Sequence, residues 1–105
     1  MDRLNKRIAT LGGVFLIISL LVGMFASMPR GETVFSEQRC HTCHRFKGQG
    51  GMAGPDLTDV IERRGAVWII RQIRNPKSHN PDSRMPSYDH LGYTEIYAII
   101  SYLKS

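Results

Sequence analysis

The sequence predicts a small all-α domain preceded by a single membrane-spanning helix. An uncharged, largely apolar run extends over Ile8–Met28. As a helix it would be about 31 Å long, which matches the hydrocarbon core of a bilayer. Beyond this run, no segment of useful length alternates apolar and polar residues, as a half-buried strand would. The end of the chain instead has apolar residues at helical spacing, namely Ile96, Ile99, Ile100 and Leu103.

The apolar run is expected to be an uncleaved membrane anchor. A signal peptide usually has an apolar region of about 7–15 residues and a small-x-small cleavage site. This run is longer, and its end contains no A-x-A-like pair. Three of the seven residues before the run are basic and one is acidic, and basic residues next to a span stay on the cytoplasmic side. We therefore expect residues 1–7 to be cytoplasmic and residues 8–28 to be a transmembrane helix. The remainder is expected on the periplasmic (extracytoplasmic) face of the cytoplasmic (inner) membrane.

Residues 29–31 are expected to form only a short linker to a domain of residues 32–105. Five extended steps from Met28 to Thr33 cover at most about 18 Å, so the domain should lie against the membrane surface. The whole chain has a net charge of +5, but three of its 14 Lys and Arg and one of its 9 Asp and Glu precede the span, so the part after the span carries +3. This excess is too small to indicate nucleic-acid binding.

Local signals in the first half of the domain predict two helices and a loop. The first helix is expected over residues 32–44. The glycine-rich segment 47–55 predicts a loop without regular structure. Thr58 is then expected to cap a short helix that runs to Arg64 and ends at Gly65.

The second half of the domain predicts two further helices. Ala66–Arg74 has an apolar side, and the Asn75-Pro76 pair that follows disfavours continuation of the helix. Residues 75–92 contain three prolines and are expected to be irregular. Thr94 is expected to cap the last helix.

The pentad Cys40-His41-Thr42-Cys43-His44 contains the only two cysteines of the chain. This C-x-x-C-H spacing is typical of covalent attachment of a c-type haem, in which each thiol adds to one vinyl group of the porphyrin. The two cysteines lie about one helical turn apart, so both sulfurs can reach the same haem edge. The sequence therefore predicts one covalent haem c, with His44 as an axial ligand of the iron.

Two other interpretations of the cysteine pair are open but less favoured. A zinc site needs four nitrogen or sulfur ligands, so His79 and His90 would have to join the pentad, and their spacing is not typical of zinc sites. A redox-active dithiol is expected at the start of a helix that follows a strand. No β-rich run precedes Cys40.

The second axial ligand must come from the opposite face of the haem. The candidates are Met52, Met85, His79 and His90. Met85 is favoured because Pro86 biases it toward an extended conformation, and an irregular loop can present a thioether inward without competing with helix packing. Met52 fits better as a core filler, which is the usual role of methionine.

Residues 32–105 resemble a class I c-type cytochrome. The resemblance is carried by four pieces in order: a helix with Phe35 leading into the pentad, Gly54-Pro55-Asp56-Leu57, Arg84-Met85-Pro86, and a terminal helix ending in Tyr102-Leu103. It implies a small fold of three to five helices around the haem. The first and last helices would cross, with Phe35 packed against Tyr97 or Tyr102.

The resemblance also implies roles for individual residues. Met85 takes the family position of the sixth ligand. The carbonyl group of Pro55 would accept a hydrogen bond from the second ring nitrogen of His44, which fixes the imidazole. The residues that would contact the haem propionates are Trp68, Arg71 and Tyr88.

The expected function is transfer of single electrons, as a subunit of a quinol-oxidising or terminal-oxidase complex. Membrane-embedded subunits and a soluble cytochrome are the expected partners. Because His44 and Met85 would fill both axial positions, the protein is expected to be an electron carrier and not an enzyme. The alternatives are a stand-alone tethered carrier that serves soluble partners, and a haem enzyme or gas-binding protein if Met85 does not ligate.

Overall fold

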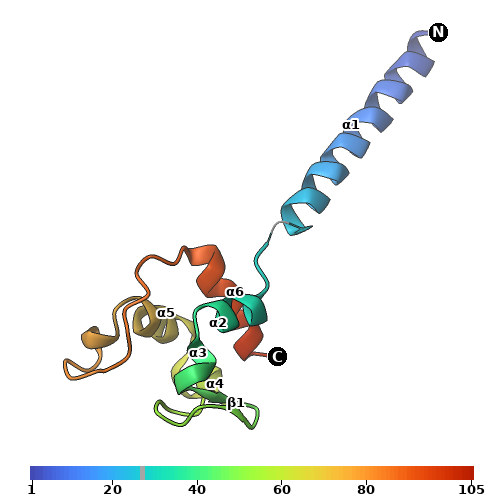
Figure 1. Cartoon of the computed structure of the whole chain (residues 1–105). Coiled ribbons are helices and arrows are strands. Elements are labelled where there is room, and N and C mark those ends of the chain that lie inside the picture. Colours follow the sequence, from blue (N-terminus) through green and yellow to red (C-terminus); the bar gives the residue numbers. More distant parts are fainter. Residues whose placement is uncertain (27) are drawn as a thin grey trace.

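The computed structural model describes residues 1–26 and 28–105. Figure 1 shows a long helix, α1, that leads away from a small domain containing all the other elements. The molecule is correspondingly elongated, with extents of 73 × 28 × 24 Å. This division into one isolated helix and one compact domain matches the organisation predicted from the sequence.

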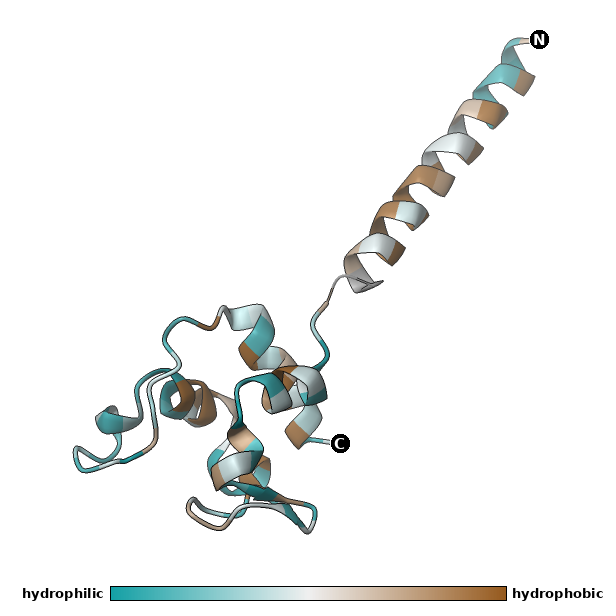
Figure 2. Ribbon diagram, in the orientation of Figure 1, coloured by the Kyte–Doolittle hydropathy of each residue, from teal (hydrophilic) through white to brown (hydrophobic). Residues whose placement is uncertain are grey.

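The isolated helix α1 spans Asp2–Ala26. Its large apolar side chains up to Met24 are exposed, and the apolar residues form brown bands along the helix in Figure 2. Over Asp2–Met24 it is long and apolar enough to cross a membrane, so α1 is a candidate transmembrane helix. It begins before the expected Ile8 because the basic N-terminal residues continue the same helix. At the other end, the expected span 8–28 includes Ser27, which lies outside the described residues.

The domain is mostly helical, as the sequence predicts, with one small pair of strands. Its elements in order are α2 (Gly31–Glu37), α3 (Cys40–Cys43), β1 (Arg45–Phe46), β2 (Gln49–Gly50), α4 (Val60–Arg64), α5 (Ala66–Arg74), the 3-10 helix η1 (Pro76–Ser78) and α6 (Tyr93–Leu103).

The expected single helix over residues 32–44 is wrong in detail, because it is divided into α2 and α3. Arg39, between the two helices, has a φ of 61° and adopts the left-handed conformation. A right-handed helix cannot continue through that conformation. The break redirects the chain, so α3 presents the pentad from its own axis rather than as an extension of α2.

The glycine-rich segment is also more regular than expected. β1 and β2 pair antiparallel, with Arg45 opposite Gly50 and Phe46 opposite Gln49. The two residues between them, Lys47 and Gly48, both have positive φ values of 49° and 80°, as in the tight turns that suit the twist of a hairpin. The glycine that argued against regular structure therefore supplies the hairpin turn.

Both ends of α5 and the end of α4 agree with the sequence, whereas the starts of α4 and α6 differ from the expected ones. α5 has the predicted bounds, and Gly65, with a φ of 75°, ends α4 as expected. Thr58 is not a cap, because α4 begins at Val60 and the Thr58 hydroxyl donates a hydrogen bond to the Asp56 carboxylate instead. Thr94 is not a cap either, since α6 begins one residue earlier and Gly92 precedes it.

The core of the domain forms where α2 packs against α6 (Figure 1). The four apolar residues predicted for the last helix are all buried, each at most 5% exposed. The ring of Tyr102 lies 5.5 Å from the ring of Phe35 and 5.0 Å from that of Phe46, whereas Tyr97 is 57% exposed. Of the two tyrosines proposed for the crossing, Tyr102 is therefore the one that packs there.

The two crossing helices approach most closely at Gly31. A Cβ at this position would lie 1.9 Å from the carbonyl oxygen of Ala98 and 2.7 Å from the Cβ of Tyr102, so only glycine fits without a shift of the backbone. The sequence had suggested that Gly31 belongs to the linker 29–31. In the structure, however, Gly31 is the first residue of α2. Only residues 27–30 separate α1 from the domain.

Candidate functional site

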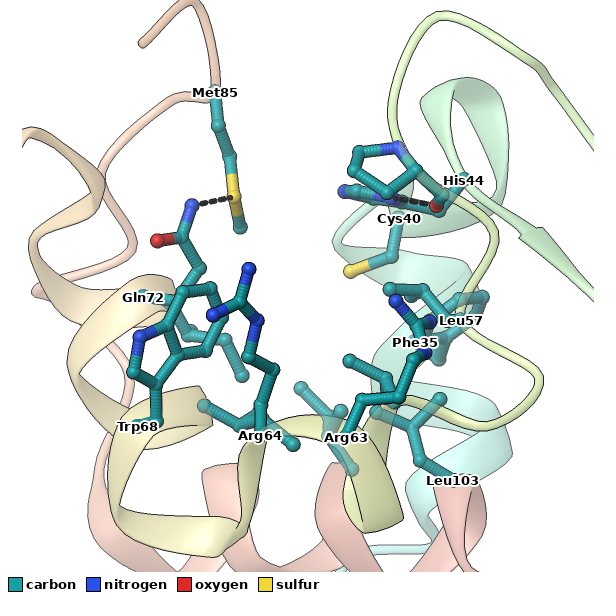
Figure 3. A pocket seen from close by; sticks show the side chains of 15 residues that line it. Phe35, Cys40, His44, Leu57, Arg63, Arg64, Trp68, Gln72, Met85 and Leu103 are labelled. Carbon is teal, nitrogen blue, oxygen red and sulfur yellow. Dashed lines mark hydrogen bonds between the residues drawn. The ribbon is translucent and has the colours of Figure 1, made fainter. Parts of the chain in front are cut away.

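A largely apolar cavity lies between α5 and the Met85 segment on one side and α3 with its following loop on the other (Figure 3). Its apolar lining includes Ile69 and Ile73 of α5 and Ile99 and Leu103 of α6. The empty volume is about 760 Å³, and this figure includes space that is open to solvent.

His44 forms part of one wall of the cavity and is held there by the backbone around it. Its Nδ1 lies 2.8 Å from the carbonyl oxygen of Pro55, and a carbonyl can only accept, so Nδ1 carries the proton. This tautomer leaves Nε2 as a bare lone pair. A Cβ on Gly54 would lie 2.6 Å from Cε1 of the imidazole. The ring therefore packs directly on the Gly54 backbone. The side chain of any larger residue at position 54 would occupy the space that the ring fills.

Met85 forms part of the opposite wall. It is half-buried in the irregular segment between η1 and α6, and its thioether faces Cys40 and His44 across the cavity in Figure 3. The side-chain amide of Gln72 on α5 donates a hydrogen bond to the Met85 sulfur over 3.5 Å. The cavity thus brings an imidazole nitrogen and a thioether sulfur to facing walls.

The two cysteines lie in different surroundings. Cys40 lines the cavity, and burial raises the pKa of its thiol to about 11. Cys43 is exposed. Redox-active dithiols depend on a thiol whose pKa is lowered, so the surroundings of Cys40 argue against that interpretation of the pair. In the part of the chain that the structure describes, no three His, Cys, Asp or Glu side chains are grouped to hold a metal ion, which gives the zinc alternative no ligand set.

The three residues expected at the propionates do not lie together. Trp68 lines the cavity. Arg71 is exposed on α5 and is not part of the lining. Tyr88 lies against the core, outside the lining, and its hydroxyl donates to the Gln38 carbonyl oxygen over 3.2 Å.

The other candidates for the sixth ligand are not part of the cavity lining. Met52 is 81% exposed, so it is neither a ligand candidate on geometric grounds nor a core filler. His90 is exposed and contacts Gln38. His79 is half-buried and stacks on the ring of Trp68. Among the four candidates, only Met85 lines the cavity.

Three polar lining residues were missed by the sequence analysis: Arg63, Arg64 and Gln72. The guanidinium of Arg64 lies 4.6 Å from the centre of the Trp68 ring, and that of Arg63 donates to the carbonyl oxygen of Asp56 over 2.7 Å. Gln72 lies one helical turn after Trp68 and so shares its side of α5. That spacing was the available signal for Gln72, while the two arginines were recognisable only as basic residues near a helix end.

This site fits a covalently attached haem. It offers an apolar cavity, a thiol on one wall, an imidazole nitrogen and a thioether sulfur on opposite walls, and the cationic side chains of Arg63 and Arg64 in the space between them (Figure 3). The fold and the site together define a small c-type haem protein.

The chain belongs to the cytochrome c family, since the family model for Cytochrome c matches residues 28–105. The protein therefore carries covalently bound haem c, as the sequence predicted, and the Cys40 and Cys43 pair lies in its C-x-x-C-H region.

The chain is also similar to parts of two proteins named as subunits of respiratory enzymes. Cytochrome c oxidase subunit 2 of Alkalihalophilus pseudofirmus is 32% identical over 84 residues, which cover 72% of this chain and 25% of that protein. A subunit of nitric oxide reductase from Halomonas halodenitrificans is 28% identical over 94 residues, which cover 78% of this chain and 60% of that protein. The chain thus spans only about a quarter of the length of the oxidase subunit and about three fifths of the length of the reductase subunit.

Proposed function

We propose that this protein is a membrane-anchored carrier of single electrons, with its haem iron ligated by His44 and Met85. The observation that carries the proposal is that these two side chains face each other from opposite walls of one apolar cavity. Haem iron held by histidine and methionine cycles between Fe(II) and Fe(III) at a potential raised by the thioether ligand.

The surroundings of His44 support its role as a ligand. The hydrogen bond from Nδ1 to Pro55 fixes the tautomer that leaves Nε2 unprotonated, which is the form that binds a metal. The same bond orients the ring and raises the basicity of the nitrogen that binds.

With both axial positions filled by side chains, the site has no open coordination position for a substrate. This supports a carrier function and disfavours the alternatives of a haem enzyme or gas-binding protein. We assign the residues that neutralise the haem propionates as Arg63 and Arg64 together with Trp68, because they line the cavity. The exposed Arg71 and the core-packed Tyr88 are less suited to that role.

The short connection to α1 and the similarity to the two subunits support membership of a larger complex. With only residues 27–30 between α1 and α2, the domain cannot move far from the end of α1, because chain reach grows slowly with length. We place the domain on the extracytoplasmic face of the cytoplasmic membrane, where it would pass electrons between a membrane-embedded subunit and a soluble cytochrome. A tethered carrier that serves only soluble partners is the second candidate.

Ligation by Met85 is tested on the holoprotein by spectroscopy. The ferric protein should show the near-infrared band of a methionine-ligated haem, and the ferrous protein should not bind CO. Met85→Ala should abolish the band, allow CO to bind and lower the reduction potential. Met52→Ala is the matched control, since this methionine is exposed, and it should leave all three properties unchanged. A near-infrared band that survives in Met85→Ala would contradict the assignment.

Membership of a complex is tested by lengthening the connection. About twenty Gly and Ser residues inserted after Pro29 would leave the Arg30 carbonyl, which accepts from Val34 at the start of α2, in place. The insertion should slow electron transfer from a membrane-embedded donor by lowering the effective concentration of the haem. The same residues placed before Asp2 serve as the control. Equal turnover of the two variants, with no protein co-purifying in mild detergent, would favour the stand-alone carrier.

A further inference from the structure

Behind Met85 lies a chain of three contacts in which each side chain orients the next. Met85 accepts a hydrogen bond from the side-chain amide of Gln72 over 3.5 Å. The other end of that amide lies 2.8 Å from Nδ1 of His79. The imidazole of His79 in turn stacks on the indole of Trp68, with a centroid distance of 4.2 Å and an angle of 4° between the rings.

Only one arrangement of protons satisfies both contacts of the Gln72 amide. A thioether sulfur accepts and cannot donate, so the amide NH₂ must face Met85 and the amide oxygen must face His79. The oxygen accepts only, so Nδ1 of His79 carries a proton. If the amide were rotated by half a turn, its oxygen would face the sulfur with no proton between them. The proton on His79 therefore holds the Gln72 amide in the orientation that donates to Met85.

The position of His79 is itself held from two sides. Its ring lies flat on Trp68, and its backbone N–H donates to the carbonyl oxygen of Pro76 at the start of η1. Both the stacking and the bond to Gln72 connect η1 to α5, so the orientation of the Gln72 amide is fixed by tertiary packing and not by the rotamer of Gln72 alone.

We propose that Gln72 is the positioning residue for the Met85 ligand and that His79 acts on Met85 through Gln72. The proposal rests on the ligation of iron by Met85 proposed above. A thioether sulfur has two lone pairs, and a hydrogen bond to one leaves the other directed to the metal. Gln72 thus selects which lone pair faces the iron, and it restrains the ligand against displacement. Because the hydrogen bond withdraws electron density from the sulfur, it also favours Fe(II) and raises the reduction potential.

The first test compares substitutions of Gln72 in the holoprotein. Gln72→Leu removes the donor at nearly constant shape, and Gln72→Glu replaces it with a carboxylate that cannot donate when ionised. In both variants imidazole should displace the methionine of the ferric protein at a concentration about two- to tenfold lower than in the wild type, the range expected for the loss of one hydrogen bond. The reduction potential should fall. Gln49→Leu, at an exposed glutamine of β2, is the matched control and should change neither.

The second test asks whether His79 acts through Gln72. His79→Phe keeps a ring that can stack on Trp68 and removes the proton that holds the amide. His79→Phe should shift the imidazole affinity and the reduction potential in the same direction as Gln72→Leu does. Both shifts should be smaller than those of Gln72→Leu. The double variant should show no effect beyond that of Gln72→Leu, since the two residues act on one contact.

The outcomes separate this proposal from the proposed ligation. A wild-type protein without the near-infrared methionine band would overturn the ligation by Met85. If the band is present but both Gln72 variants match Gln49→Leu in imidazole affinity and potential, ligation stands and the positioning role is wrong. If the effects of His79→Phe and Gln72→Leu simply add, His79 does not act through Gln72.

Discussion

The close approach of α2 to α6 at Gly31 leads to a quantitative prediction for Gly31→Ala. The added Cβ would lie 1.9 Å from the carbonyl oxygen of Ala98, whereas unstrained contacts begin at about 3.5 Å. The helices would have to separate by roughly 1.5 Å at this point. That shift would loosen the packing of Phe35 against Tyr102, whose rings are 5.5 Å apart.

Overpacking of this kind costs about 1–3 kcal/mol, which exceeds the gain of up to about 1 kcal/mol that alanine brings within a helix. For a domain of this size, each kcal/mol changes the unfolding midpoint by about 4–8 °C. After the alanine gain is subtracted, we therefore expect the holoprotein with Gly31→Ala to unfold at a temperature lower by up to about 24 °C. The single tryptophan, Trp68, lies in the domain and reports on unfolding by its fluorescence.

Two further variants test the reasoning. Gly92→Ala also replaces a glycine next to a helix start, but its Cβ would meet only a Glu95 oxygen at 3.8 Å, so the midpoint should change little. Ala98→Gly combined with Gly31→Ala should not restore stability, because the clash is with the backbone oxygen of residue 98 and not with its side chain. If Gly31→Ala is as stable as Gly92→Ala, the helices do not cross as closely as described.

Three other substitutions are informative. Gly54→Ala should displace the His44 ring, since its Cβ would lie 2.6 Å from the imidazole, and should shift the reduction potential and the low-spin haem spectrum, whereas an unchanged spectrum would contradict this packing. Arg64→Leu should lower the potential by roughly 40 mV, because a unit charge beside the haem contributes on the order of 1 kcal/mol. Redox titration measures the shift, and an unchanged potential would mean that this guanidinium does not act on the haem. The hydrogen bonds from Thr58 lower the pKa of the Asp56 carboxyl, so its contribution to stability is present above the unfolded pKa near 3.9 and is lost as the pH falls through the lower folded pKa. Asp56→Asn should therefore make acid unfolding less steep in that range, and identical acid titrations of the two proteins would count against this linkage.

The sequence by itself determined the chemistry of this protein and most of its helices. Covalent haem attachment needs residues that are contiguous in the chain, so Cys40 and Cys43 reveal it without any knowledge of the fold. The apolar run and the face formed by Ile96, Ile99 and Ile100 likewise depend on local spacing, because burial in lipid or in a core selects apolar residues at the period of the helix.

Other features depend on contacts between residues distant in the chain, and only the tertiary structure decided them. The left-handed conformation of Arg39 divides the first helix although nothing in its residue type demands it. Local patterns also could not tell Arg71 from Arg64 as the cationic residue beside the cavity.

The contact of Gln72 with Met85 and His79 joins α5 to the irregular segment after it. Local spacing predicts which face of a helix is apolar, but which polar residues at the edge of that face line the cavity depends on the rotation of the helix within the packed domain. For α5 that rotation is set by the burial of Ile69 and Ile73 in the core, which is a property of the assembled fold.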